Sequence, residues 1–160
     1  VAEQYGGAVG DKAKYFIAVN QLSLDRAVGI QELEGLSSRS DEVGKLAKFA
    51  LAQTRAEDGR LDDAAALFKD LAGMPDPVVS KDSVNFELAK VYEKQGKKQE
   101  AVDLLFEIAK TASERKDLEG KPLTLSASAL AAKEKLKALD PEKAKAIPEP
   151  TPPPPLGLGQ

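Results

Sequence analysis

Two stretches of the chain decide the fold: residues 46–71, LAKFALAQTRAEDGRLDDAAALFKDL, and residues 83–108, SVNFELAKVYEKQGKKQEAVDLLFEI. Aligned without gaps, they share identical Phe, Leu, Ala and Gly residues at a constant offset of 37 (88 minus 51). At several other positions one apolar residue replaces another. Similarity at a fixed period, confined to apolar and glycine positions, is typical of a stacked repeat, because only the contact positions are constrained.

Each copy predicts two helices joined by a glycine turn. Leu51 and Ala52 lie on one face of the first helix, which ends at Gly59 or, in the second copy, at Gly96. Apolar residues then recur at steps of three and four from Ala64 onward. Such a hairpin has an apolar face that a neighbouring hairpin must cover, so the expected fold is all-α.

This pattern resembles the tetratricopeptide repeat in its Leu-Ala pair, the aromatic Tyr92 three residues after Ala89, the turn glycine and the Ala that begins the second helix. Arg55 departs from it, because it stands where the family has an aromatic residue. The resemblance implies a right-handed superhelical stack of helical hairpins, a solenoid with a C-terminal capping helix. The small Ala52, Ala64, Ala89 and Ala101 would lie where helices approach most closely.

The flanks extend the array into one domain over residues 1–147. We expect repeats at about 12–36, 41–73 and 81–117, and a capping helix over 124–139.

In the degenerate first repeat, an offset of 37 places Ala27 at the position of Ala64, and Ser23 is the expected N-cap of its second helix. Asp140 and Pro141 predict the start of a short final helix that runs to about Ile147.

The amino-acid composition limits the kinds of partner, metal site and catalytic mechanism that we expect. A net charge of −3 and a pI near 5.2 argue against nucleic acid as a partner. The 160 residues include no Cys and no His, so the usual transition-metal ligand sets and Ser-His or Cys-His mechanisms are missing. Asp58, Asp62 and Asp63 cluster at one turn, where we interpret them as solvated capping carboxylates rather than a cation site. We therefore expect no enzyme activity, no metal and no cofactor.

Residues 148–160 are compositionally distinct, with six of the ten prolines and only Leu156 and Leu158 as sizeable apolar residues. Such a run favours an extended polyproline II tail. It could lie on its own domain, on a lattice neighbour or on a partner, and in the last case the two leucines would be the anchors.

The first helices of a tetratricopeptide stack line a concave groove that accepts a peptide. The residues that correspond to groove-facing positions are Phe49, Gln53, Ala56, Phe86, Lys90 and Glu93. For the two phenylalanines, a role as interface anchors and a role in the core are equally open. Lys90 with Lys94 could bind a ligand carboxylate, although a solvated helix face is the more common role of such lysines.

The overall layout also resembles the periplasmic part of the bacterial ancillary translocon subunit family, whose members carry an N-terminal membrane anchor. This implies a location on the periplasmic side of the inner membrane, with the cytoplasm as the alternative. Because the chain starts at Val1, either a leader was removed or a segment lies upstream. The expected function is a protein–protein interaction module, an envelope scaffold or chaperone-like factor that binds a client or membrane-complex subunit. The alternative is a permanent structural subunit of a membrane-associated assembly, with the tail docked on a neighbour.

Overall fold

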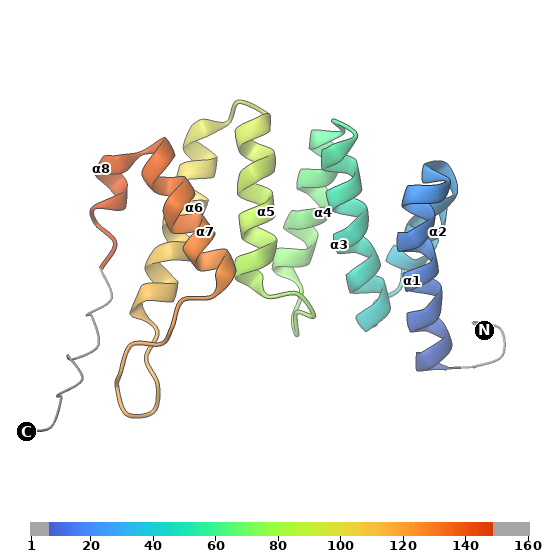
Figure 1. Ribbon diagram of the computed structural model, residues 1–160, viewed down its shortest axis with the longest axis horizontal. Helices are drawn as coiled ribbons and strands as arrows, with labels where there is room; N and C mark the ends of the chain where they lie inside the picture. The colour runs from blue at the N-terminus through green and yellow to red at the C-terminus, as the bar shows by residue number, and fades with distance from the viewer. Residues whose placement is uncertain (1–6, 149–160) are drawn as a thin grey trace, which may run out of the picture.

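The computed structural model describes residues 7–148, which form a row of helices without any strand (Figure 1). Each helix packs against the next one in the sequence, so the row consists of consecutive helix pairs. An isolated β-bridge between Lys116 and Pro122 closes the loop between α6 and α7. The prediction of an all-α fold is confirmed. The helices of the described residues are α1 (Ala8–Leu24), α2 (Arg26–Ser37), α3 (Glu42–Glu57), α4 (Leu61–Gly73), α5 (Lys81–Lys94), α6 (Lys98–Glu114), α7 (Ala127–Leu139) and α8 (Pro141–Ala144).

The predicted glycine turns join α3 to α4 and α5 to α6. Gly59 has a φ of 76° and Gly96 a φ of 75°, values that glycine adopts without the steric cost of a Cβ. At the opposite ends of these hairpins, the side chains of Asp41 and Ser80 accept hydrogen bonds from backbone N–H groups and cap α3 and α5. The local sequence therefore determines where α3 and α5 begin and where the turns that follow them lie.

The first hairpin corrects two predictions. Ser23 lies inside α1, and Asp25 is the N-cap of α2, with its side chain accepting from the Val28 N–H. Ala27 is exposed and is not the counterpart of Ala64. Gly29 takes that place: it is the fourth residue of α2, as Ala64 is of α4, and it is buried.

The offset between these two positions is therefore 35 (64 minus 29), not 37, because residues 38–41 join α2 to α3 whereas the longer segment 74–80 joins α4 to α5, a difference that the longer α3 offsets only in part. A Cβ built on Gly29 would lie 2.5 Å from the Leu22 backbone nitrogen. The two helices are thus too close at this point for any side chain larger than hydrogen to fit without a shift.

The core runs along the row as three neighbouring clusters of buried side chains. Ala52, Ala64, Ala89 and Ala101 are all fully buried, as expected for positions where helices approach closely. One large residue from the second helix of each hairpin, Leu33, Phe68 or Leu105, fills the interior beside them.

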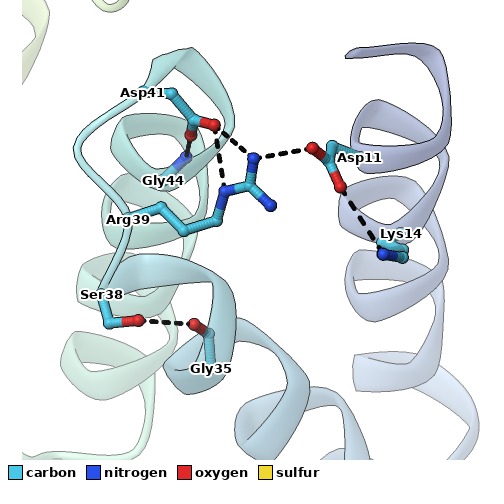
Figure 2. A network of polar contacts seen from close by, with 7 residues as sticks. All are labelled: Asp11, Lys14, Gly35, Ser38, Arg39, Asp41 and Gly44. Atoms are coloured by element: carbon cyan, nitrogen blue, oxygen red, sulfur yellow. Dashed lines mark hydrogen bonds and ion pairs between the residues drawn. The ribbon is translucent and has the colours of Figure 1, made fainter. Parts of the chain in front are cut away.

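Arg39 forms a hydrogen-bonded bridge between α1 and the loop that joins α2 to α3 (Figure 2). Its Nη2 donates to Asp11 of α1 at 2.6 Å, and its guanidinium also pairs with Asp41. Asp41 in turn accepts from the Gly44 N–H at 2.9 Å. Arg39 lowers the pKa of both the Asp11 and the Asp41 carboxyl, mainly through hydrogen bonds to the charged forms.

At the other end of the row, α7 packs on α6 and also touches α5. Ser126 caps α7, and Asp140 caps α8 by accepting from the Lys143 N–H. The prediction that the last helix reaches Ile147 is wrong, because α8 ends at Ala144 and a turn follows. Ile147 is nevertheless buried against the C-terminal cluster.

Candidate functional site

Two adjoining hollows lie over the first helices of the hairpins. One, of about 330 Å³, lies between the α1–α2 hairpin and α3. The other, of about 120 Å³, lies between α3 and α5. Gln53 and Glu57 of α3 line both of them, so the two hollows meet along α3. We call the combined depression the α3 groove; its residues are Tyr15, Val19, Leu22, Ser23, Arg26, Ala50, Gln53, Thr54, Ala56, Glu57, Glu87, Lys90, Val91 and Lys94.

Helical spacing brings these side chains together. On α3, Ala50, Gln53 and Glu57 follow one another at steps of three and four, which is one face of a helix. On α5, Glu87 and Lys90 are three residues apart and lie on the face that looks toward α3.

Apolar side chains form part of the surface of the larger hollow. Tyr15, Val19 and Leu22 belong to the N-terminal core cluster, and each is only partly buried. Burial raises the pKa of the Tyr15 phenol, which is therefore neutral at physiological pH. This part of the groove can accommodate an apolar side chain of a ligand.

Most charged groups in the groove form ion pairs. Arg26 Nη2 lies 2.7 Å from Asp58 and 3.1 Å from Glu57. Lys90 Nζ lies 2.8 Å from Glu87. A ligand carboxylate or ammonium group that enters the groove would exchange with these exposed pairs, and such exchange costs little because exposed ion pairs contribute at most about 1 kcal/mol.

Of the predicted site residues, Gln53 and Lys90 lie in the α3 groove and line the same hollow. Phe49 packs edge-to-face on Phe68, with ring centroids 5.7 Å apart, which places it between α3 and α4. Phe86 packs against the C-terminal core cluster, with Lys90 Nζ 5.8 Å from its ring centroid.

The remaining predicted positions have different outcomes. Ala56 does line the smaller hollow. Glu93 is not among the lining residues and pairs with Lys135 of α7 at 2.6 Å. Leu156 and Leu158, together with the predicted polyproline tail beyond Pro148, lie outside the described residues.

The sequence reasoning did not single out Glu57, Glu87 and Val91. On α5 the predicted face ran through Phe86, Lys90 and Glu93, whereas the face that lines the groove is rotated by about one residue. The charge pair between Glu87 and Lys90, at a helical spacing of three, was the available signal.

The acidic cluster near the α3–α4 turn is engaged within the protein. Asp58 pairs with Arg26, Asp62 accepts from Gln95 Nε2 at 2.7 Å, and Asp63 accepts from Arg60 Nε at 2.6 Å. Across residues 7–148, no group of three or more acidic side chains is arranged to hold a metal ion.

Comparison with protein-family models, curated proteins and solved structures gave no match. Among the helices that the structure describes, none combines the length and the apolar character needed to span a lipid bilayer.

Proposed function

We propose that this protein is a protein–protein interaction module, and that its helix pairs form a tetratricopeptide-like solenoid with the α3 groove on the concave side. The contacts between helices support this curvature. α1 touches α3, α3 touches α5 and α5 touches α7, whereas contact among α2, α4 and α6 is marginal at most. A row whose first helices are closer together than its second helices curves toward the first helices.

The observation that carries the proposal is the joining of the two hollows at Gln53 and Glu57. The groove thereby crosses three successive first helices and is long enough for several residues of a peptide. Its apolar patch beside Tyr15 and its paired charges near Lys90 fit a short segment with an apolar side chain flanked by charged ones.

A selection of random 12-residue peptides on the immobilised protein tests the proposal. Dissociation constants of the enriched peptides are then measured by fluorescence anisotropy. Gln53→Trp places an indole between the two hollows and is expected to weaken binding roughly tenfold or more. Lys110→Trp, at an exposed position of α6, is the matched control and should bind as the parent does. Peptides that bind Gln53→Trp as tightly as the control would contradict a site in the α3 groove.

The resemblance in layout to the periplasmic part of the ancillary translocon subunit family supports a scaffold or chaperone-like role at the bacterial inner membrane. Arg55 weakens the resemblance to the tetratricopeptide repeat less than the sequence alone implies. It is only 8% exposed and pairs with Glu34 of α2, so it fills the interior position of the family's aromatic residue. The genomic reading frame upstream of Val1 tests the location, because an apolar segment of about 20 residues there would supply the anchor.

A further inference from the structure

α1 is apolar on two opposite faces, and only one of them is covered. Tyr15, Ala18, Val19 and Leu22 belong to the N-terminal core cluster that α1 shares with α2 and α3. The other face forms a continuous stripe at helical spacing. We call it the outer stripe of α1; it consists of Val9, Ala13, Phe16, Ile17, Asn20 and Leu24.

The outer stripe is open to solvent. Val9 is 67% exposed, Phe16 60%, Ile17 44% and Leu24 82%. α1 lies at one end of the row of helices, so no other hairpin of the described residues covers it (Figure 1). The remaining large exposed apolar residues of the described chain are scattered in loops or stand singly on a helix. A helix that is apolar on both sides is normally buried on both sides.

The side chains of the stripe are complementary in size to those of a second copy of α1 that runs in the opposite direction. We place two copies of α1 antiparallel with their centres aligned. Each residue then faces the residue of the second copy whose number, added to its own, gives 33. Val9 then meets Leu24, and Phe16 meets Ile17. A large side chain meets a large one at each of these levels.

The polar residue in the stripe fits the same arrangement. Asn20 meets Ala13, the smallest residue of the stripe. Its Nδ2 donates to the Phe16 carbonyl at 2.9 Å, so part of its hydrogen-bonding capacity is already satisfied within α1. The contact thus tolerates Asn20 without requiring a new partner for that donor.

Charges favour the antiparallel direction. Lys12 and Lys14 flank the N-terminal half of α1, and a parallel pairing would bring the lysines of the two copies to the same level along the contact. In the antiparallel pairing Lys12 and Lys14 lie at the levels of Gln21 and Val19 of the second copy, away from its lysines. Asp25, which is exposed after the last residue of α1, then lies near the N-terminus of the opposing helix, where the helix dipole favours a negative charge.

We infer that the outer stripe of α1 is a dimerisation surface that binds a second copy of this chain, with the two α1 helices antiparallel about a two-fold axis near Phe16 and Ile17. The contact is isologous, so it closes after two copies. It lies on the opposite face of α1 from Tyr15 and Leu22, and it therefore leaves the α3 groove open in both copies. The inference does not depend on the proposed groove function.

Sedimentation equilibrium of the 160-residue chain over a range of concentrations tests the inference. The parent should form dimers, and Phe16→Glu should raise the dissociation constant roughly tenfold or more, since it places two carboxylates at the axis. Leu118→Glu is the matched control, because Leu118 is fully exposed on a loop at the far end of the row, and it should dimerise as the parent does. Circular dichroism verifies that all three proteins keep the same helicity.

Two outcomes would overturn the inference. One is a parent chain that stays monomeric at several hundred micromolar. If that monomer pellets with phosphatidylglycerol vesicles and the Phe16→Glu variant does not, the outer stripe binds a lipid surface instead. The other is a dimer whose dissociation constant is the same in Phe16→Glu and Leu118→Glu, which would place the contact elsewhere.

Cysteine cross-linking tests the direction, and the chain is well suited to it because it contains no cysteine. An oxidised mixture of the Val9→Cys and Leu24→Cys variants should give a disulfide-linked dimer. Val9→Cys alone should not, because its two copies would lie about 22 Å apart along the helix axis, from 15 residues (24 minus 9) at 1.5 Å each, and a disulfide needs Cα atoms within about 7 Å. Efficient cross-linking of Val9→Cys alone would overturn the antiparallel arrangement.

Discussion

Replacing Gly29 by Ala should separate α1 from α2, because a Cβ at this position has no room. It would lie 2.5 Å from the Leu22 nitrogen, 2.9 Å from the Gln21 carbonyl carbon and 3.0 Å from the Ala18 oxygen. All three atoms belong to the backbone of α1, so no side-chain rotation can relieve the clash. The hairpin must open by several tenths of an ångström at its tightest point.

The magnitude follows from a comparison with Gly35, another glycine of the same helix. A Cβ on Gly35 would meet nothing within 4 Å. Gly35→Ala should therefore stabilise the protein by up to about 1 kcal/mol through helix propensity alone. Gly29→Ala has the same gain but also an overpacking cost of about 1–3 kcal/mol. The gain in helix propensity is nearly the same in both variants and cancels when their free energies of unfolding are subtracted. Gly35→Ala should therefore be more stable than Gly29→Ala by about 1–3 kcal/mol.

Urea unfolding of the two variants and the parent, followed by circular dichroism, measures this difference. In a thermal melt it should appear as about 2–4 °C per kcal/mol for a chain of this size. Equal stabilisation by Gly29→Ala and Gly35→Ala would refute the close approach of α1 and α2, and with it the assignment of Gly29 to the place of Ala64.

Two further predictions concern the packing and the polar fastening of the row. Ala101→Phe should destabilise the protein by about 1–3 kcal/mol, because Ala101 is fully buried. The control Ala66→Phe, at an exposed position of α4, should leave the unfolding midpoint nearly unchanged. Equal effects of the two substitutions would show that the helix register is wrong. Arg39→Met should lower the free energy of unfolding at pH 7, because Arg39 pairs with the charged forms of Asp11 and Asp41 and lowers the folded-state pKa of both. The loss should become smaller as the pH falls below the ordinary Asp pKa of 3.8, because the carboxylates are then protonated and the pairs are lost. Urea unfolding from pH 7 to pH 2 measures it, and a loss that stays constant down to pH 2 would contradict a role for these carboxylates.

The two central hairpins could be predicted from the sequence because their signals are local. Gly59 and Gly96 end helices through their own backbone freedom, and Asp41 and Ser80 cap helices a few residues away. None of these effects needs information from another part of the chain. The same holds for the all-α character, which follows from apolar residues at steps of three and four.

The first hairpin could not be placed by counting. The connection that follows it, residues 38–41, is shorter than the corresponding segment 74–80, and the small residue that the close approach requires is Gly29 instead of Ala27. An offset carried over from the clear repeats misses such a change, because the register depends on how α1 and α2 meet in space.

The candidate site shows the same division between local and tertiary information. Gln53 and Lys90 could be assigned to the groove from their repeat positions, yet the rotation of α5 against α3 determines that Glu87 also lines it, whereas Glu93 turns toward Lys135. That rotation results from the packing of all the neighbouring helices.

The sequence by itself determined the helices of the two central hairpins, their glycine turns and the small residues at their crossings, because each depends on residues within one or two helical turns. Only the tertiary structure decided which faces are covered. Arg55 is buried and pairs with Glu34, which lies 21 residues earlier in another hairpin. The two apolar faces of α1 look alike in the sequence, and it is the packing of α2 and α3 on one of them that leaves Phe16 and Leu24 in solvent.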